Sequence, residues 1–537
     1  MAACPAPALH SDGHAHRGKT HISHTVRQRD LTETDCCGSL HPLCHRPHHA
    51  HKPCGHECLP PGGAPPPVVC GIHPPRGDKT LPAGDVIMKA CVIGAGIGGL
   101  STAALLLKEG WAVEVYESER VPGGRALSSE VDDGYKNLLK KFRISVVASE
   151  PAMEHIPEVA EGYTVDLGFH LIGGGKRGAC VRLLRELGID IPFAGSRLGL
   201  IDREVSYPIV NAADKMAMLP RIMQLLFTRK SKIEEMKRMS VEQLIEKYGR
   251  GKLTLLLELF PRLITTVNDL SRISAGEMLF AQRELMGGDP VIYPYGGLKN
   301  ISQSLVEYIS RHGGEMHLGR KVGKVLIEEG RAIGVKVGRS EREYDAVIAT
   351  MPVQHLFTVA DEQEFPGEWV EYVRNLQPTG SVVSYHALSE LNGRLLNKSF
   401  VFIERDADFE GGAVVGMIDF KMNHLTGMAP PGKYLIQSYA ICTPDEAKNR
   451  SKREELVGII EKHVADLMPA NRRNLEWNIH AAIWHLDGVA KTIDCMKPDV
   501  ATPVNRLYLA GDCVNSKGVG INCAADSARL VVDAIQH

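Results

Sequence analysis

The chain has 537 residues, of which 44% are apolar and 23% are charged, and its formal net charge is −2. This length exceeds a single hydrophobic core and, with this composition, is typical of a globular protein of two or three domains. The sequence indicates neither bulk attraction to nucleic acid, nor a membrane span of roughly 20 apolar residues, nor a signal peptide, so we expect a cytoplasmic protein without a nucleic-acid partner.

The first 87 residues hold 7 of the 13 cysteines, 12 of the 23 histidines and 13 of the 31 prolines. They lack hydrophobic periodicity and cannot bury enough apolar surface to fold alone, so we predict a disordered segment. The run "HPLCHRPHHAHKPCGHEC" is rich in metal ligands but lacks the paired Cys-x-x-Cys spacing of zinc sites, and we predict no metal site. Met88 is the first methionine after Met1 and precedes the first expected strand, which leads to the hypothesis that translation begins there.

Residues 88–117 have the pattern of a dinucleotide-binding unit, in which a strand, a tight turn, a helix and a second strand follow one another. We predict strands at 89–93 and 112–116 and a helix at 100–109 that Gly110 ends. Between the first strand and the helix lies a G-x-G-x-x-G turn, formed by Gly94, Ala95, Gly96, Ile97, Gly98 and Gly99.

The glycines of this turn have separate roles in holding a pyrophosphate. Gly94 permits the tight turn, Gly96 lets the backbone approach the phosphates, and Gly99 brings the helix close to the strand. The helix N-terminus offers unpaired N–H groups and the positive end of its dipole. Glu117, at the end of the second strand, is suited to accept hydrogen bonds from ribose hydroxyls. The unit predicts a dinucleotide but does not distinguish NAD from FAD.

The segment "ERVPGGRA", residues 119–126, favours FAD. A Gly-Gly-Arg shortly after the ribose-binding acid resembles the flavin amine oxidase and phytoene desaturase superfamily. In that superfamily the glycines pass close to the cofactor and the arginine lies near its phosphates or its ring. The resemblance implies that Gly124 and Arg125 bind FAD, and a mobile surface arginine is the alternative.

Two further segments resemble the same superfamily. The segment "YTVDLGFHLIGGG" (163–175) is similar to a D-x-G-x-H stretch beside the flavin, although His170 could equally be a core histidine. In residues 293–337 we predict a helix at 298–311, a strand near Met316 and a hairpin that turns at 329–330. The resemblance implies that Val322, at the start of the hairpin, holds adenine through its backbone. Residues 344–352 then read as a buried strand that rejoins the sheet.

The C-terminal segment "NRLYLAGDCVNSKGVGINCAADSARLVVDAI" (505–535) is the most specific of these motifs. It predicts a strand, a glycine-bearing loop and a helix that begins near Ile521, and it is similar to the flavin signature of phytoene desaturases. By this resemblance Asp512 binds the ribityl chain or the pyrophosphate, and the helix directs its positive end at the flavin. The cofactor-binding residues predicted here are Gly511, Asp512, Gly520, Ile521 and Asn522.

Together these segments predict an α/β fold with a Rossmann-type FAD-binding domain that is assembled from discontinuous stretches. We assign residues 88–187, 291–362 and 503–537 to that domain. The inserted residues 188–290 and 363–502 form a mixed α+β substrate domain, in which alternating segments such as "GSVVSYHALS" indicate an antiparallel sheet. Substrate and flavin are expected to meet in the crevice between the two domains.

The substrate domain carries fewer functional signals. Residues 216–232 are apolar with basic residues near one end, which fits a helix on a membrane surface, a lid over an apolar cavity, or a core helix. His480 and His485 precede the last cofactor segment, where satisfied core histidines are favoured over substrate contacts. No residue stands out as a catalytic acid or base, since the flavin itself takes the hydride.

The resemblance implies an FAD-dependent oxidoreductase that removes hydrogen from a hydrophobic small molecule, such as a carotenoid-like polyene, by hydride transfer to flavin. The electron acceptor is unassigned, and peripheral membrane contact is an open option. Two alternatives share the fold: a flavin-dependent carotenoid-type isomerase, and a flavin-free binding protein like the Rab GDP-dissociation inhibitors. An aromatic content of 6% weighs mildly against an amine-binding aromatic cage, and a nicotinamide-only dehydrogenase leaves the C-terminal motif without a purpose.

Overall fold

The computed structural model describes residues 87–537 except 169–170, 280–290, 421–425, 470 and 494. The predicted disordered segment at the N-terminus and the candidate His170 therefore lie outside the described residues. Among the helices within the described ranges, we find none that is long and apolar enough to cross a membrane.

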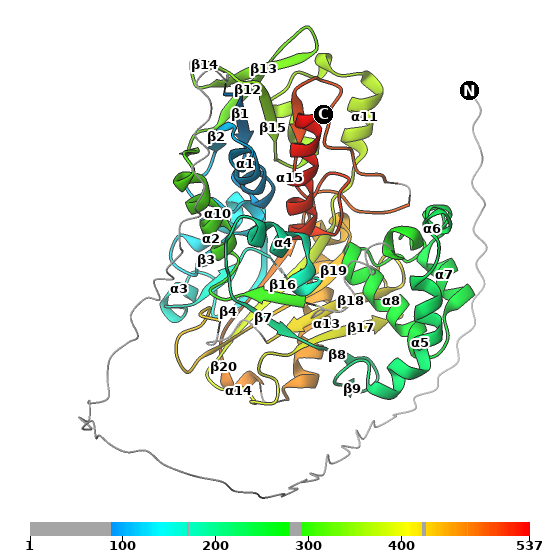
Figure 1. The fold of residues 1–537 in the computed structure, drawn as a ribbon. Coiled ribbons are helices and arrows are strands. Elements are labelled where there is room, and N and C mark those ends of the chain that lie inside the picture. The colour runs from blue at the N-terminus through cyan, green and yellow to red at the C-terminus, as the bar shows by residue number, and fades with distance from the viewer. Residues whose placement is uncertain (1–86, 169–170, 280–290, 421–425, 470, 494) are drawn as a thin grey trace, which may run out of the picture. The chain divides into compact units, whose positions relative to one another are not determined.

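A five-stranded parallel sheet carries the cofactor motifs (Figure 1). In spatial order its strands are β11 (Glu315–Leu318), β2 (Ala112–Glu117), β1 (Lys89–Ile93), β15 (Ala346–Ala349) and β21 (Leu507–Leu509). The inner strands β1 and β15 are almost wholly apolar and buried, as parallel strands that are covered on both faces require. This sheet confirms the predicted α/β class with a Rossmann-type unit.

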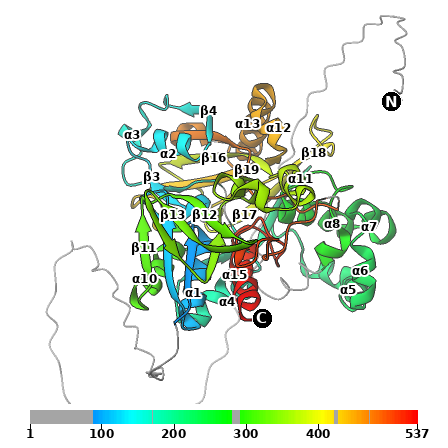
Figure 2. The ribbon, with the colours of Figure 1, turned by 90° about the horizontal axis from the view of Figure 1, so that it is seen from above.

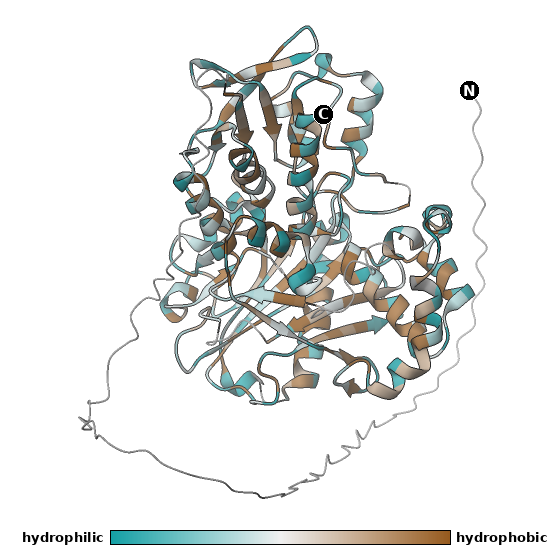
Figure 3. Cartoon of the chain, viewed as in Figure 1, coloured by the Kyte–Doolittle hydropathy of each residue, from teal (hydrophilic) through white to brown (hydrophobic). Residues whose placement is uncertain are grey.

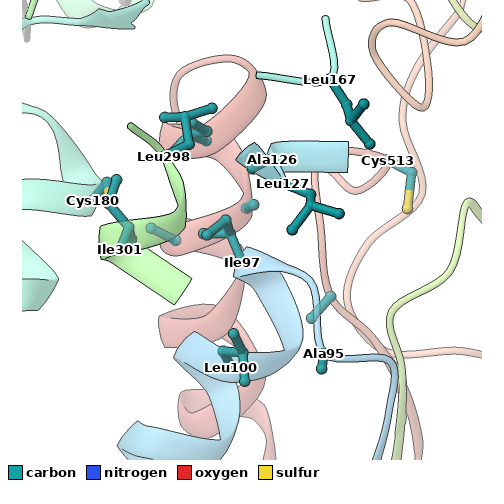
Figure 4. Packing of buried hydrophobic residues seen from close by; sticks show 14 of the residues in the cluster. Ala95, Ile97, Leu100, Ala126, Leu127, Leu167, Cys180, Leu298, Ile301 and Cys513 are labelled. Atoms are coloured by element: carbon teal, nitrogen blue, oxygen red, sulfur yellow. The ribbon is translucent and has the colours of Figure 1, made fainter. Parts of the chain in front are cut away.

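Three helices of the cofactor motifs pack together beside this sheet: α1 (Ile97–Lys108), α10 (Lys299–Arg311) and α15 (Gly520–Gln536). Helix α1 contacts both α10 and α15. Figure 4 shows Ile97 and Leu100 from α1 gathered with Leu127, Leu298 and Ile301 in the buried core. The first and last motifs of the chain therefore share one hydrophobic core.

The larger sheet has eight mostly antiparallel strands. In spatial order they are β4 (Ser145–Glu150), β20 (Leu475–Ile483), β16 (Gly380–Leu388), β19 (Tyr434–Cys442), β18 (Ala413–Asp419), β17 (Ser399–Arg405), β8 (Leu198–Ile201) and β9 (Val205–Ser206). Strand β4 pairs with β20, although its residues fall in a stretch that we assigned to the FAD-binding domain. The domain boundaries themselves stay a prediction.

Side chains along these strands alternate between two hydrophobic clusters, as the period of two in a strand requires. Tyr385 and Tyr439 face the core that is shared with the parallel sheet, whereas Val382 and Ala440 face α13 (Arg450–Leu467). Figure 3 shows how the apolar colouring concentrates in the inner strands of both sheets. The larger sheet is therefore a wall with two buried faces.

The remaining strands of the described residues form three small sheets, and several short helices accompany them. The strands are β6 (Ile172–Gly173), β10 (Val291–Pro294) and β7 (Phe193–Ser196) in one sheet, β12 (Val322–Glu328), β13 (Arg331–Val337) and β14 (Ser340–Glu343) in a second, and β3 (Ser128–Glu130) with β5 (Thr164–Asp166) in a third. The helices are α2 (Tyr135–Lys141), α3 (Ile156–Val159), α4 (Ala179–Glu186), α11 (Gly367–Asn375), α12 (Pro444–Lys448) and α14 (Asn471–Asn474). The hairpin of β12 and β13 turns at residues 329–330, as predicted.

A separate group of helices follows β9 in the chain (Figure 2). It consists of α5 (Ala212–Leu226), α6 (Lys230–Met236), α7 (Val241–Tyr248) and α8 (Lys252–Thr265), which enclose a small apolar cluster of their own. The prediction of one helix over residues 216–232 is wrong, because the helix is interrupted between Leu226, where α5 ends, and Lys230, where α6 begins. There Thr228 bonds the carbonyl of Gln224 through its side chain, and Arg229 adopts an extended conformation that caps α6.

Asp166 is a buried carboxylate that ties separate cofactor segments together. It accepts hydrogen bonds from the hydroxyl groups of Ser128 on β3 and Tyr293 on β10 and from the backbone N–H of Leu298 before α10. Burial raises the pKa of Asp166 to about 6, although these hydrogen bonds oppose the shift. The side chain is therefore most favourable to the fold when it is protonated.

We expect Asp166→Asn to remove a pH dependence of stability. The folded pKa of about 6 exceeds the ordinary value of 3.8, so the stabilising contribution is complete at acid pH and is lost as the pH rises through 6. The free energy of unfolding of the parent, relative to the variant, should fall by up to about 3 kcal/mol between pH 4 and pH 7. Thermal unfolding across this range measures it, with the exposed Asp190→Asn as control. Equal pH slopes for parent and Asp166→Asn would contradict the assignment.

Candidate functional site

A cavity of about 1140 Å³ opens at the carboxyl edge of the parallel sheet and continues along the larger sheet. Thirteen of the fifteen predicted cofactor residues line it: Gly94, Gly96, Ile97, Gly98, Glu117, Gly124, Arg125, Val322, Gly511, Asp512, Gly520, Ile521 and Asn522. The other two, Ala95 and Gly99, lie behind this surface. The backbone N–H of Ala95 donates to Glu117 Oε2 at 2.7 Å, and a Cβ at Gly99 would collide with the Gly94 carbonyl.

The glycine turn before α1 is shaped to receive an anionic group. Gly94 has a positive φ of 111°, and a Cβ built on Gly96 would meet no atom within 4 Å, although Gly96 borders the cavity. No side chain caps the N-terminus of α1, and its first turn holds no acidic residue. Its first N–H groups therefore face the cavity without an internal partner, as a pyrophosphate site requires.

Glu117 lies at the end of β2 with its carboxylate fixed by the backbone. Its Oε2 accepts from Ala95 N, and its Oε1 accepts from the N–H of Glu119 at 2.9 Å. Oε1 also accepts from Ser118 Oγ at 3.1 Å, whereas Oε2 keeps a second acceptor site with which it can bind a ribose hydroxyl. The side chain is only 9% exposed, which holds it in one orientation.

Arg125 and Asp512, which the sequence suggested as separate cofactor residues, form an ion pair across the cavity floor. Asp512 Oδ2 also accepts from the N–H of Gly488 at 2.8 Å, and its carbonyl accepts from Lys497 Nζ at 2.5 Å. Burial raises the pKa of Asp512, but the charge and hydrogen bond of Arg125 outweigh burial and lower that pKa. Asp512 is therefore an ionised carboxylate whose position depends on Arg125.

The remaining predicted residues lie at two other borders of the cavity. Val322 begins β12 and is buried, which leaves its backbone as the group that can face a ligand. Helix α15 begins at Gly520 without a side-chain cap. The amide of Asn522 is occupied within the protein, because it donates to the carbonyl of Gly173 and accepts from the N–H of Cys180.

Asp487 is a cavity residue that the sequence analysis missed. Its Oδ2 accepts from Thr266 Oγ1 at 2.9 Å. Burial and the negative charge of Asp512 raise its pKa, and the charge of Lys497 only partly opposes them. The sequence signal for Asp487 is the acid of "WHLDG", shortly after the apolar strand β20.

The two histidines of that segment have different surroundings. His485 lines the cavity, and burial together with the charge of Arg125 lowers its pKa to about 4, so it is neutral at pH 7. His480 is buried within β20 on the face that packs against α13. Of these two histidines, His485 is therefore the one that is available to a ligand in the cavity.

The cavity wall away from the glycine turn is apolar. One face of α8 supplies Leu253, Leu256, Leu257, Phe260, Leu263 and Ile264, which recur with helical spacing. Met417 and Tyr439 extend this wall from the larger sheet, and Ile222 extends it from α5. One cavity thus has a polar end, at the glycine turn, and an apolar end, at α8.

Comparison with known proteins defines the class. The sequence pattern of the flavin-containing amine oxidoreductases matches residues 97–536, and the chain belongs to this family. It is a flavin-dependent oxidoreductase whose cofactor is FAD, as predicted, and the flavin-free alternative is not supported.

Two proteins with similar sequences and one solved structure illustrate the similarity. The chain is 23% identical over 463 residues to the zeta-carotene desaturase of Zea mays, covering 79% of each protein. It is 25% identical over 299 residues to the zeta-carotene-forming phytoene desaturase of Myxococcus xanthus, covering 50% of this chain and 54% of that protein. The fold is similar to that of an oxidoreductase from Methanosarcina mazei, with a TM-score of 0.65 and 21% sequence identity. The match covers 83% of this chain and 100% of the other.

We expect Glu117→Gln and Asp512→Asn to weaken FAD binding without unfolding the chain. Each change removes a charged acceptor, and Asp512→Asn also removes the carboxylate that pairs with the half-buried Arg125. The dissociation constant of FAD should rise about 10-fold or more in each variant. The ratio of flavin to protein absorbance after dialysis measures this. Glu114→Gln, on the same strand as Glu117 but outside the cavity lining, is the control, and flavin retention equal to the parent in both variants would refute the assignment.

Proposed function

We propose that this enzyme dehydrogenates a hydrophobic, polyene-like small molecule. The observation that carries the proposal is the cavity that joins the glycine turn to the apolar face of α8. A desaturation needs an apolar chain to lie beside the flavin, and this lining provides for it. The names of the curated relatives, zeta-carotene desaturase and phytoene desaturase, support the same substrate class.

FAD, when bound, supplies the acceptor of the hydride. In our proposal Gly96 and the N-terminus of α1 hold its pyrophosphate, Glu117 accepts from its ribose, and Val322 contacts its adenine. The Arg125–Asp512 pair and the start of α15 then border the flavin end. The apolar residues of α8 exclude water and align the substrate with that end.

Desaturation also releases a proton from the carbon next to the one that loses hydride. Three acidic residues line the cavity within the described part of the chain: Glu117, Asp487 and Asp512. Glu117 accepts backbone N–H groups and Asp512 pairs with Arg125, whereas Asp487 has a raised pKa and accepts from Thr266, the residue directly after α8. We therefore assign Asp487 as the base that accepts this proton.

The substrate class is tested by mixing the FAD-loaded enzyme with substrate in the absence of oxygen. Zeta-carotene in detergent should bleach the visible absorption of the oxidised flavin and yield a desaturated product. Putrescine, an amine substrate of a protein with a similar fold (TM-score 0.56), should leave the flavin oxidised. Bleaching by putrescine alone would contradict the proposal, and a rearranged polyene without bleaching would indicate an isomerase.

The role of Asp487 is tested by Asp487→Asn. Removing a general base costs about 10²- to 10⁴-fold in rate, so the anaerobic rate of flavin reduction should fall within that range while FAD retention is unchanged. The parent rate should rise with pH as a carboxyl group with a pKa above 3.8 ionises, and the variant should lack this rise. Asp499→Asn, outside the cavity lining, is the control. A rate equal to that of the parent would remove Asp487 from the mechanism.

We also propose that α5 brings the apolar substrate in from a lipid surface. Four large, exposed side chains recur along α5 and the residue that follows it: Met216 (71% exposed), Leu219 (45%), Met223 (40%) and Phe227 (75%). Lys215 and Arg221 are exposed beside them, as in helices that lie in a membrane interface. On the opposite side Met218 is buried and Ile222 lines the cavity.

We expect Met216→Ser combined with Phe227→Ser to reduce binding to lipid vesicles. The two exposed side chains supply most of the apolar area that a bilayer would bury, so the fraction that co-sediments with anionic vesicles should fall at least about 10-fold. Met496→Ser is the matched control, since Met496 is 70% exposed elsewhere. Equal sedimentation of parent and double variant would contradict the lipid contact.

A further inference from the structure

A cluster of two histidines and one glutamate is buried on the face of the larger sheet that packs against α13. His386 lies on β16 and His480 on β20, and Glu461 reaches them from α13. Ser384 is the register partner of His480, so these side chains lie on one face. Tyr385, between Ser384 and His386, belongs to the opposite face, so the cluster is separate from the flavin cavity.

The three side chains direct ligand atoms toward a common point. His386 Nε2 lies 2.5 Å from Glu461 Oε1, and His480 Nε2 lies 3.6 Å from the same oxygen. One atom from each residue falls within 4.8 Å of the others. A tetrahedral ion with bonds of 2.0–2.1 Å needs ligand atoms about 3.3 Å apart, and the two separations from Glu461 Oε1 lie within about 1 Å of that value.

The surroundings of the histidines are those of a ligand site. Ser384 Oγ lies 2.7 Å from His480 Nδ1, which fixes the ring and leaves Nε2 directed at Glu461. The side chain of His386 is 1% exposed, whereas that of Glu461 is 31% exposed. Water can therefore reach the cluster from the side of Glu461 alone.

We propose that His386, His480 and Glu461 bind a divalent zinc ion, with water as its fourth ligand. Two imidazoles and one carboxylate are a donor set that suits Zn²⁺, and hard cations such as Mg²⁺ prefer oxygen alone. The ion links β16, β20 and α13 and stabilises the packing of the helix on the sheet. The ligands come from three elements far apart in the chain, which is why no spacing motif predicted them.

The zinc content of the full-length, FAD-loaded protein tests this site. Protein equilibrated with Zn²⁺ is desalted, and zinc per chain is measured by plasma mass spectrometry. The first 87 residues hold 12 histidines and 7 cysteines, residue types that can take up added zinc, so the difference between variants carries the result. Glu461→Gln should bind about one zinc ion fewer than the parent. Glu454→Gln on the same helix and His317→Gln, in a half-buried histidine–carboxylate group of the parallel sheet, should bind as much as the parent.

Thermal unfolding separates this site from the N-terminal ligands, because zinc bound to that segment alone would leave the packing of α13 unaffected. Free zinc at about 100 times its dissociation constant should raise the melting temperature of the parent by about 3 °C and that of Glu461→Gln not at all. If Glu461→Gln loses FAD, His480→Gln replaces it in both measurements. Equal zinc content and equal thermal shifts in parent and variant would overturn the proposal and leave a hydrogen-bonded His386–Glu461 pair.

Discussion

The architecture depends on the contact between the first turn of α1 and the end of β21. A Cβ on Gly98 would lie 2.9 Å from the backbone of Gly511, closer than side chains approach. Without side chains at these two positions, the first and last cofactor motifs meet backbone to backbone. Their separation in the sequence is thus closed at the one edge of the sheet where parallel strands end and a dinucleotide can bind.

This contact also determines where the charges of the site lie. Asp512 follows Gly511 directly, and Arg125 reaches it from the segment after β2. Four buried or half-buried charged groups result, because Asp487 and Lys497 adjoin the same pair. Two positive and two negative groups balance one another, so the site can remain dry without a net buried charge.

The larger sheet explains how an apolar substrate and a nucleotide share one cavity. Side chains alternate along β18 and β19, so Met417 and Tyr439 face the cavity while their neighbours pack under α13. The sheet is held on that second face by the core of α13. The cavity wall on the sheet side is therefore backed by a packed core, and the facing wall is formed by α8 and α5.

The motifs that could be predicted are those in which neighbouring residues act together. The glycine turn, Glu117 and the hairpin at residues 329–330 are local, so spacing alone located them. Asp487 and β4 were missed because their partners are distant in sequence: Asp487 is defined by Thr266 and Asp512, and β4 by β20. The break after α5 was missed because a side chain–backbone hydrogen bond of Thr228 overrides the apolar periodicity.

The flavin and the substrate place different electrostatic demands on the site. Arg125 and Asp512 neutralise each other, so this pair would supply little of the electrostatic field at a bound, reduced flavin. The uncapped N-terminus of α15 is suited to supply it, since its first N–H groups begin at the cavity-lining Gly520. A helix dipole does not titrate, whereas Asp487 does. In the proposed mechanism the fold thereby separates a constant source of charge for the cofactor from a proton-accepting group for the substrate, and of these two only Asp487 responds to pH.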